Sequence, residues 1–259
     1  MKTTAIVLAA GQGKRMGSDV AKQYLLLCGK PVLYYTLKNF EDSQVDEVIL
    51  VTAADQIEYC QKEIVDAFGF TKVKQIVAGG KERYHSVANG LRAIAKRENC
   101  AKANSACSEN YVKTDYVLIH DGARPFATPE IIARGIEAVQ IHKACVIGMP
   151  VKDTIKISDI DGFAEQTPNR NLVWQIQTPQ IFAFDLIHNA YEELLLKEEE
   201  LKPKKENGEE KRIDLGIDGL CGCMCWRTTS PKMAAADHHS QSARKKDRKS
   251  TRLNSSHRT

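Results

Sequence analysis

Short apolar runs alternate with longer helical patterns over most of this chain, and that alternation constrains its fold more than any other feature. The runs are rich in Val and Ile and mostly continuous, as is typical of strands buried on both faces of a parallel sheet. The predicted strands are Ala5–Leu8, Val48–Thr52, Val73–Val77, Tyr116–His120 and Ala144–Met149. The predicted helices are Val32–Asn39, Gln56–Ala67, Tyr84–Arg97, Pro129–His142 and Asp185–Lys197. We therefore expect an α/β fold with a mostly parallel sheet.

The composition is ordinary for a globular protein, with 42% hydrophobic and 27% charged residues. No apolar run approaches the roughly 20 residues that a membrane-spanning helix needs, so no membrane association is expected. The N-terminus leads directly into the first predicted strand, which leaves no visible secretory signal and favours a cytoplasmic location. Two polar insertions interrupt the pattern. Residues 98–114 are interpreted as a surface loop, and the charge run 197–211 as a solvated helix end and mobile loop.

The net charge of +4 comes from the C-terminal segment. Residues 221–259 hold nine Lys and Arg against two Asp, a local charge of +7, which leaves −3 for residues 1–220. The folded part is therefore not expected to bind nucleic acid. Residues 214–259 are either a basic arm or an out-of-frame, disordered segment that is not native coding sequence. We favour the second interpretation because 247–257 resembles a translated sequencing-library adapter. The clustered cysteines at 221, 223 and 225 lack zinc-knuckle spacing.

Three polar clusters follow predicted strands, where α/β proteins place their sites. They are the opening loop 9–16, the loop 77–86 and the loop 120–125. The opening loop lacks the third glycine of a dinucleotide fingerprint, and Gly79-Gly80-Lys81 is followed by glutamate rather than the Ser or Thr of a P-loop. Small residues beside Lys14, Arg15 and Lys22 still suit a phosphate ligand.

An isolated strand-end carboxylate, Asp121, completes a set that nucleotidyl transfer needs. In that reaction a phosphate oxygen attacks the α-phosphorus of a nucleoside triphosphate in line with departing pyrophosphate, and cations neutralise the developing charge. Mg²⁺ suits one or two carboxylates together with substrate phosphates and water. Taken alone, Asp121 is more often a helix cap or turn residue than a metal ligand, so the hypothesis depends on the whole set.

The motifs together resemble one family, 2-C-methyl-D-erythritol 4-phosphate cytidylyltransferase of the non-mevalonate isoprenoid pathway. The resemblance covers roughly residues 1–213. It is carried, in order, by Leu8-Ala9-Ala10-Gly11-x-Gly13-x-Arg15-Met16, Lys22-Gln23-Tyr24, Gly79-Gly80-x-x-Arg83-x-x-Ser86-Val87, His120-Asp121-Gly122-Ala123-Arg124-Pro125 and Thr178-Pro179-Gln180. It implies a Rossmann-like nucleotidyltransferase domain over 1–213, with CTP, Mg²⁺ and a polyol phosphate as ligands. It also implies a homodimer joined by a projecting β-arm at about 152–177.

Site residues follow by motif from the same resemblance. Those that would wrap the CTP phosphates are Ala9, Ala10, Gly11 and Gly13. Those that would recognise cytosine and the ribose surroundings are Gly80 and Ser86. Arg15 and Lys22 would stabilise the transition state, and Asp121 would hold Mg²⁺. The residues that would reach the acceptor phosphate are Arg124, Thr154, Arg170 and Thr178, with Arg170 counted among the catalytic groups.

Structural interpretations stand beside these functional ones. Arg83 and Arg124 are equally well explained as structural ion pairs. For Thr178-Pro179-Gln180 the functional interpretation is favoured, and a simple turn is the alternative. His85 and His120 are expected to be hydrogen bonders rather than catalytic bases, because the attacking phosphate is already ionised at neutral pH.

The family's Thr-Asp-Asp/Glu and Asn-Ile-Lys segments do not occur after residue 211, so weakened or absent activity is expected. A ribitol-5-phosphate cytidylyltransferase and a non-catalytic nucleotide-binding module remain as alternatives.

Overall fold

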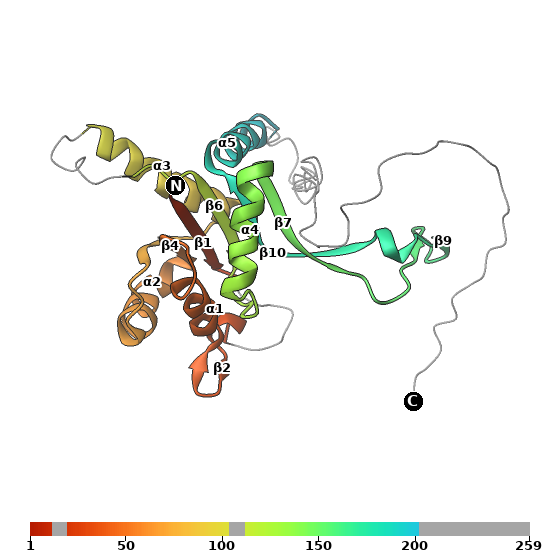
Figure 1. The fold of residues 1–259 in the computed structure, drawn as a ribbon, viewed down its shortest axis with the longest axis horizontal. Coiled ribbons are helices and arrows are strands. Elements are labelled where there is room, and N and C mark those ends of the chain that lie inside the picture. Colours follow the sequence, from red (N-terminus) through yellow and green to blue (C-terminus); the bar gives the residue numbers. More distant parts are fainter. Residues whose placement is uncertain (12–19, 104–111, 202–259) are drawn as a thin grey trace, which may run out of the picture. The chain divides into compact units, whose positions relative to one another are not determined.

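A six-stranded sheet forms the centre of the computed structural model, which describes residues 1–11, 20–103 and 112–201 (Figure 1). Its strand order is β5-β4-β1-β6-β10-β7. The strands are β1 (Thr3–Ala9), β4 (Glu47–Thr52), β5 (Val73–Ala78), β6 (Tyr116–Asp121), β7 (Ala144–Pro150) and β10 (Trp174–Ala183). β1 pairs in parallel with β4 and β6, β4 pairs in parallel with β5, and β10 runs antiparallel to β6. The predicted mostly parallel sheet is therefore confirmed.

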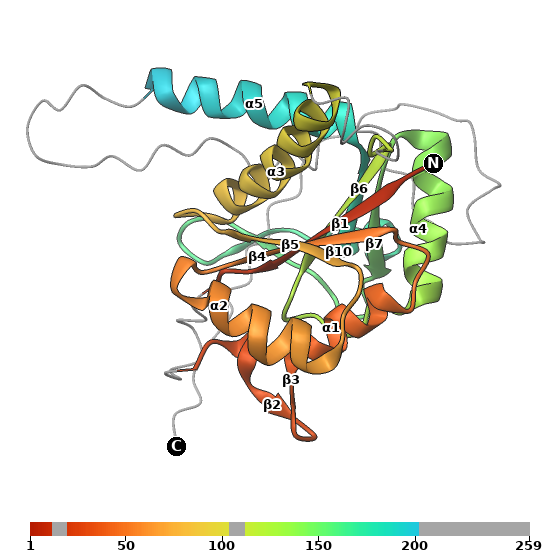
Figure 2. The same cartoon turned by 90° about the vertical axis from the view of Figure 1, so that its left-hand side faces the viewer.

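Helices cover both faces of this sheet (Figure 2). They are α1 (Val32–Glu41), α2 (Ile57–Tyr59) with the π-helix η4 (Cys60–Asp66), α3 (Arg83–Ala103), α4 (Pro129–His142) and α5 (Phe184–Leu201). One core cluster joins α1, η4 and α4 to one face, and another joins α3 and α5 to the other. Along β1, Ala5 and Val7 belong to the first cluster and Ile6 to the second. Both faces are buried, which explains why the strands read as continuous apolar runs.

Local sequence signals account for some boundaries. α4 begins at Pro129, with the Thr128 hydroxyl accepting a hydrogen bond from the Ile131 N–H at 3.5 Å. A hydroxyl cap followed by proline at the first helical position is a strong start signal, and the predicted bounds of this helix are confirmed.

The predicted surface loop at 98–114 is wrong over its first part. α3 continues to Ala103, and Glu98 is only 5% exposed. Its Oε1 accepts a hydrogen bond from the Thr114 N–H at 3.1 Å. This contact joins the helix to a residue just before β6, so it depends on the folded chain and not on local pattern.

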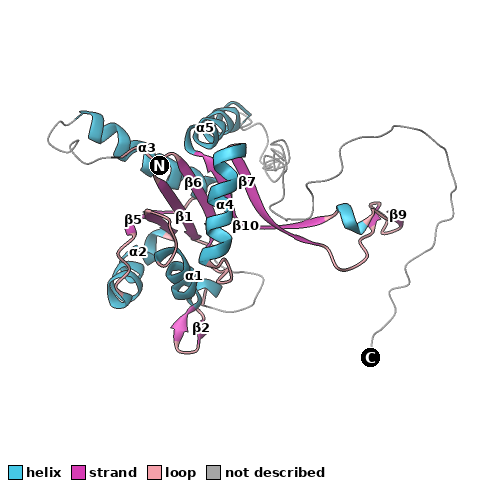
Figure 3. Ribbon diagram, in the orientation of Figure 1, coloured by secondary structure: helices cyan, strands magenta, loops and turns pink. Residues whose placement is uncertain are grey.

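Residues Gly148–Gln177 belong to a second compact unit, separate from 1–147 and 178–201. Within it lie β8 (Ile157–Ser158), β9 (Ala164–Gln166) and the 3-10 helix η6 (Arg170–Leu172), and β8 pairs with β9 in an antiparallel hairpin (Figure 3). Apolar side chains are exposed on this unit, including Ile160 at 101% and Leu172 at 73%.

The first unit also contains a small hairpin of β2 (Leu26–Leu27) and β3 (Lys30–Pro31), and the 3-10 helices η2 (Lys22–Tyr24) and η3 (Ala54–Gln56). Among the described residues, no helix is long and apolar enough to cross a membrane. The expectations for residues 214–259, including the clustered cysteines, lie outside the described part of the chain.

Candidate active site

The opening loop begins at the carboxyl end of β1. Ala9 is the last strand residue and is 2% exposed, while Gly11 is exposed. Gly13 and Arg15 lie outside the described residues. The described part therefore places the start of the expected phosphate loop at a parallel strand end, where such loops bind anions in α/β proteins.

A glutamine clamps this loop. Gln23, in η2 next to Lys22, is 4% exposed, and its Nε2 donates to the carbonyl oxygens of Ala9 at 2.6 Å and Gly11 at 2.9 Å. Both carbonyl oxygens can only accept hydrogen bonds, so the NH₂ group of the amide, and not its oxygen, must face them. The clamp fixes the turn that carries Lys22, itself exposed, to the opening loop. The sequence motif included Gln23 without giving it a role, because a 3-10 turn of three residues shows no periodicity that would reveal a buried side chain.

The second loop packs directly against the first. The Gly79 N–H donates to the Thr52 carbonyl at 2.7 Å, and a Cβ at Gly79 would lie 2.4 Å from Ala10 Cβ and 2.9 Å from Ser86 Oγ. Only glycine fits such an approach. The Gly80 N–H donates to Ser86 Oγ at 3.0 Å, and Ser86 is 4% exposed.

The third loop is joined to both neighbouring strands. The Gly122 N–H donates to the Leu8 carbonyl at 2.7 Å, and the Asp121 N–H donates to Thr178 Oγ1 at 3.3 Å. Thr178 lies inside β10, and Gln180 pairs with Ile119 of β6. The interpretation of 178–180 as a simple turn is therefore wrong. A strand places the Thr178 hydroxyl beside Asp121.

Two arginines hold the Asp121 carboxylate, whose side chain is 29% exposed. Nε and Nη2 of Arg83 donate to Oδ1 at 3.2 and 3.0 Å, and Nε of Arg124 donates to Oδ2 at 2.9 Å. Both arginines therefore form ion pairs with this carboxylate, in agreement with the structural interpretation that stood beside the functional one. Two guanidiniums against one carboxylate leave positive charge at the ends of β5 and β6, which suits a phosphate-rich ligand.

His120 is a structural hydrogen bonder. It is fully buried beside Phe40, and its Nε2 lies 2.9 Å from the Arg124 carbonyl oxygen, to which it donates. Burial lowers the pKa of His120 to about 4, so the ring is neutral at physiological pH. Its bond closes the loop that carries Asp121 and Arg124, so the hydrogen-bonding role expected of His120 is confirmed.

Thr154 and Arg170 belong to the unit 148–177. Both side chains are exposed, and Arg170 begins η6, whose start is capped by the Asn169 side chain. The structure describes both residues only within that unit.

The described residues can hold a divalent cation only together with phosphate oxygens of a substrate. No group of three His, Cys, Asp or Glu side chains within 1–11, 20–103 and 112–201 is arranged to hold a metal ion. Asp121 offers one strand-end carboxylate, and Mg²⁺ accepts one carboxylate when substrate phosphates and water complete its shell. The residues present therefore suit a metal that arrives with its nucleotide.

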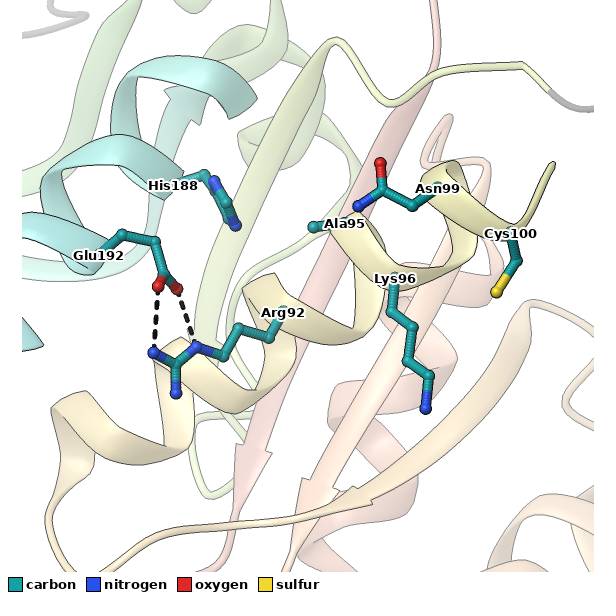
Figure 4. A pocket seen from close by; sticks show the side chains of 7 residues that line it. All are labelled: Arg92, Ala95, Lys96, Asn99, Cys100, His188 and Glu192. Carbon is teal, nitrogen blue, oxygen red and sulfur yellow. Dashed lines mark hydrogen bonds and ion pairs between the residues drawn. The ribbon is translucent and has the colours of Figure 1, made fainter. Parts of the chain in front are cut away.

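A hollow of about 550 Å³ lies elsewhere, between α3 and α5 (Figure 4). The side chains around it include Arg92, Lys96, His188 and Glu192, and Arg92 and Glu192 are paired through two hydrogen bonds at 2.8 and 3.1 Å. None of the strand-end residues lines it, so the strand-end loops are the better candidate for the chemistry.

Comparison with known proteins agrees with this geometry. A family model described as 2-C-methyl-D-erythritol 4-phosphate cytidylyltransferase matches residues 3–202. A relative of that name from Lachnoclostridium phytofermentans is 49% identical over 193 residues, 74% of this chain and 76% of the relative. Another, from Lachnospira eligens, is 50% identical over 192 residues, 74% of this chain and 77% of the relative.

A solved structure shares the fold. The crystal structure of 4-diphosphocytidyl-2C-methyl-D-erythritol synthase from Anaerococcus prevotii has a TM-score of 0.63 and 30% identity, over 88% of this chain and 86% of that one. The chain thus has a Rossmann-like α/β nucleotidyltransferase fold. By sequence and by fold, it belongs to the 2-C-methyl-D-erythritol 4-phosphate cytidylyltransferase family.

Proposed function

We propose that this chain transfers the CMP group of CTP to 2-C-methyl-D-erythritol 4-phosphate and releases pyrophosphate, as a step of isoprenoid precursor synthesis. The observation that carries the proposal is the meeting of three loops at the carboxyl ends of β1, β5 and β6. Gly79 joins the second loop to Ala10 of the first, and Arg83 joins it to Asp121 of the third. Family membership supplies the identity of the substrates.

Each loop has a role in this proposal. Ala9, Ala10, Gly11 and Gly13 wrap the CTP phosphates, and Gly80 and Ser86 receive the cytosine and ribose. Asp121 holds Mg²⁺, which when bound neutralises charge on the triphosphate. Arg15 and Lys22 stabilise the negative charge that develops at the α-phosphate.

The acceptor phosphate oxygen forms a bond to the α-phosphorus while the bond from that phosphorus to the bridging β-oxygen breaks. Pyrophosphate leaves with the electron pair of the broken bond. The acceptor oxygen is already ionised, so no side chain has to remove a proton. Arg124 and Thr178 orient the acceptor, together with Thr154 and Arg170.

We further propose a homodimer in which the unit 148–177 is the arm between subunits, and a cytoplasmic location. Apolar side chains as exposed as Ile160 and Leu172 in a small unit suit a surface that a second copy covers. The described cysteines 28, 60, 100 and 145 are free thiols, as in a reducing compartment. Light scattering of the full chain should give about twice 28.9 kDa, and a monomeric mass would contradict the dimer.

Measuring pyrophosphate release from CTP tests both the proposed reaction and the location of the active site. Lys22→Ala should lower the rate by about 100-fold or more, because it removes a fixed charge from the transition state. Lys74→Ala is the matched control. Lys74 is an exposed lysine near the amino end of β5, whereas the proposed site lies at the carboxyl ends of the strands. Equal rates for the two variants would refute the assignment of the site.

A further inference from the structure

The loop that follows β5 is built around a histidine side chain. A Cβ at Gly80 would lie 2.3 Å from His85 Cβ, so the backbone of Gly80 rests directly on this residue. The Glu82 N–H donates to Nδ1 of His85 at 3.3 Å, and the neighbouring Ser86 Oγ accepts from the Gly80 N–H and lies 3.3 Å from the Glu82 carbonyl. Moving the His85 ring would therefore disturb the backbone from Gly80 to Glu82.

The His85 ring is held by a residue of α5 that is distant in the sequence. Its Nε2 lies 3.0 Å from Oε2 of Glu198 in α5, 113 residues away in sequence. Because Nδ1 accepts a hydrogen bond from the Glu82 N–H, Nε2 carries the hydrogen and donates it to the carboxylate. The side chains of His85 and Glu198 are only 26% and 18% exposed, so the contact is partly shielded from water.

Glu198 also reaches the adjacent ring. The Tyr84 and His85 rings lie 4.1 Å apart between centroids. Burial and a hydrogen bond to the Glu198 carboxylate raise the pKa of Tyr84 to about 12. The Glu198 carboxylate therefore joins His85 to α5 and influences the neighbouring Tyr84. Glu198 belongs to the charge run that the sequence presented as a solvated helix end, and at this residue that interpretation is wrong.

We propose that Glu198 is a positioning residue for the nucleotide: acting through His85, it holds the Gly79–Glu82 backbone in the arrangement that receives the base and ribose of CTP. This inference rests on the proposed function, because it takes the 79–86 loop as the CTP-binding loop. It assigns to Glu198, and through it to α5, a part in nucleotide affinity.

The same pair of helices offers a matched control. Arg92 and Glu192 also join α3 to α5, through hydrogen bonds at 2.8 and 3.1 Å (Figure 4). They lie seven and six residues along their helices from His85 and Glu198, which is about 10 Å at 1.5 Å per residue. Glu192→Ala therefore weakens the packing of α5 on α3 without removing a contact to the Gly79–Glu82 loop. Glu198→Ala weakens the helix packing and also removes the hydrogen bond that supports this loop.

The experiment is calorimetric titration of the full chain with CTP, alongside steady-state kinetics and thermal unfolding. Glu198→Ala should raise the Kd and KM for CTP about 3- to 10-fold, with kcat and the KM for the acceptor unchanged, because a single hydrogen bond to a binding loop is lost. Glu198→Gln should restore CTP affinity, since its amide oxygen still accepts from Nε2. Glu192→Ala should lower Tm yet bind CTP as the unaltered chain does.

Alanine favours helix, so Glu198→Ala is expected to fold. Glu198→Asp, which withdraws the carboxylate by one methylene, is a second variant with the charge retained, and it should weaken CTP binding likewise. If the Ala and Asp variants bind CTP within twofold of the unaltered chain, or if Glu192→Ala weakens binding equally, the positioning role is overturned. If the unaltered chain binds no CTP, the proposed function itself fails and this assignment with it.

Discussion

Replacing Gln23 with methionine isolates the clamp on the opening loop. Methionine keeps the length and much of the volume of the side chain but donates no hydrogen bond. In the unaltered chain the Ala9 and Gly11 carbonyl oxygens lie 2.6 and 2.9 Å from the amide nitrogen of Gln23, which is only 4% exposed. Each carbonyl would lose this hydrogen-bond donor in the variant. At about 0.5–1.5 kcal/mol for each bond, Gln23→Met should reduce the free energy of unfolding by about 2 kcal/mol.

Two measurements separate the structural effect from the catalytic one. A loss of about 2 kcal/mol should lower Tm by about 4–8 °C in a domain of this size. The clamp also sets where the Ala10 and Gly11 N–H groups point, so pyrophosphate release at saturating CTP should fall about tenfold, equivalent to about 1.4 kcal/mol in the barrier.

Gln140→Met is the matched control. Its amide also donates to a backbone carbonyl, that of Ile136 at 3.2 Å, but on α4 and at an exposed position. This variant should change stability by less than about 0.5 kcal/mol and leave the rate unaltered. If Gln23→Met lowers Tm while the saturated rate stays unchanged, the clamp only stabilises the fold and the catalytic reasoning is refuted.

Two further predictions concern ionisation and metal binding. Burial raises the pKa of Glu47, but the hydrogen bond and charge of Arg97, with the charge of Lys2, outweigh it and hold the pKa below 4.5. Glu47 therefore stabilises the fold above about pH 4.5, and this stability is lost as pH falls through the lowered pKa. Urea unfolding from pH 7 to 3 should show a shallower acid loss for Glu47→Gln than for the unaltered chain, and identical slopes would contradict this. Because both oxygens of Asp121 are paired with arginines, a divalent cation should bind weakly alone and about tenfold or more tightly with a non-hydrolysable CTP analogue. Mn²⁺ titration followed by electron paramagnetic resonance measures both affinities, and equal values would be inconsistent with Asp121 as the ligand.

Local pattern was sufficient where a segment is buried on both faces or has a strong start signal. The continuous apolar runs of β1, β4, β6 and β7 were recognisable, as was β5 despite its Lys74 and Gln75, and the Thr128-Pro129 pair predicted the start of α4. β10 was not recognised as a strand. It contains Gln175, Gln177 and Pro179, and its position depends on antiparallel pairing with β6, which local pattern does not reveal.

The candidate site divides in a similar way. The strand-end loops were predictable because glycines and polar residues directly follow apolar runs. The residues that hold those loops were not, since each acts through a distant partner. Gln23 binds carbonyls 12 and 14 residues away, Glu98 binds Thr114, and Glu198 binds His85 across 113 residues. Such contacts exist only once the helices have packed on the sheet.

The most direct test is product analysis with the full chain, CTP and Mg²⁺, offering 2-C-methyl-D-erythritol 4-phosphate and ribitol 5-phosphate in separate reactions. Mass spectrometry should detect the cytidine diphosphate adduct of methylerythritol together with one equivalent of pyrophosphate, and only a trace of the ribitol adduct. A dominant ribitol product would contradict the assigned acceptor. The absence of both products together with the absence of CTP binding, under conditions in which an active family member turns over, would contradict the assignment of this chain as a cytidylyltransferase.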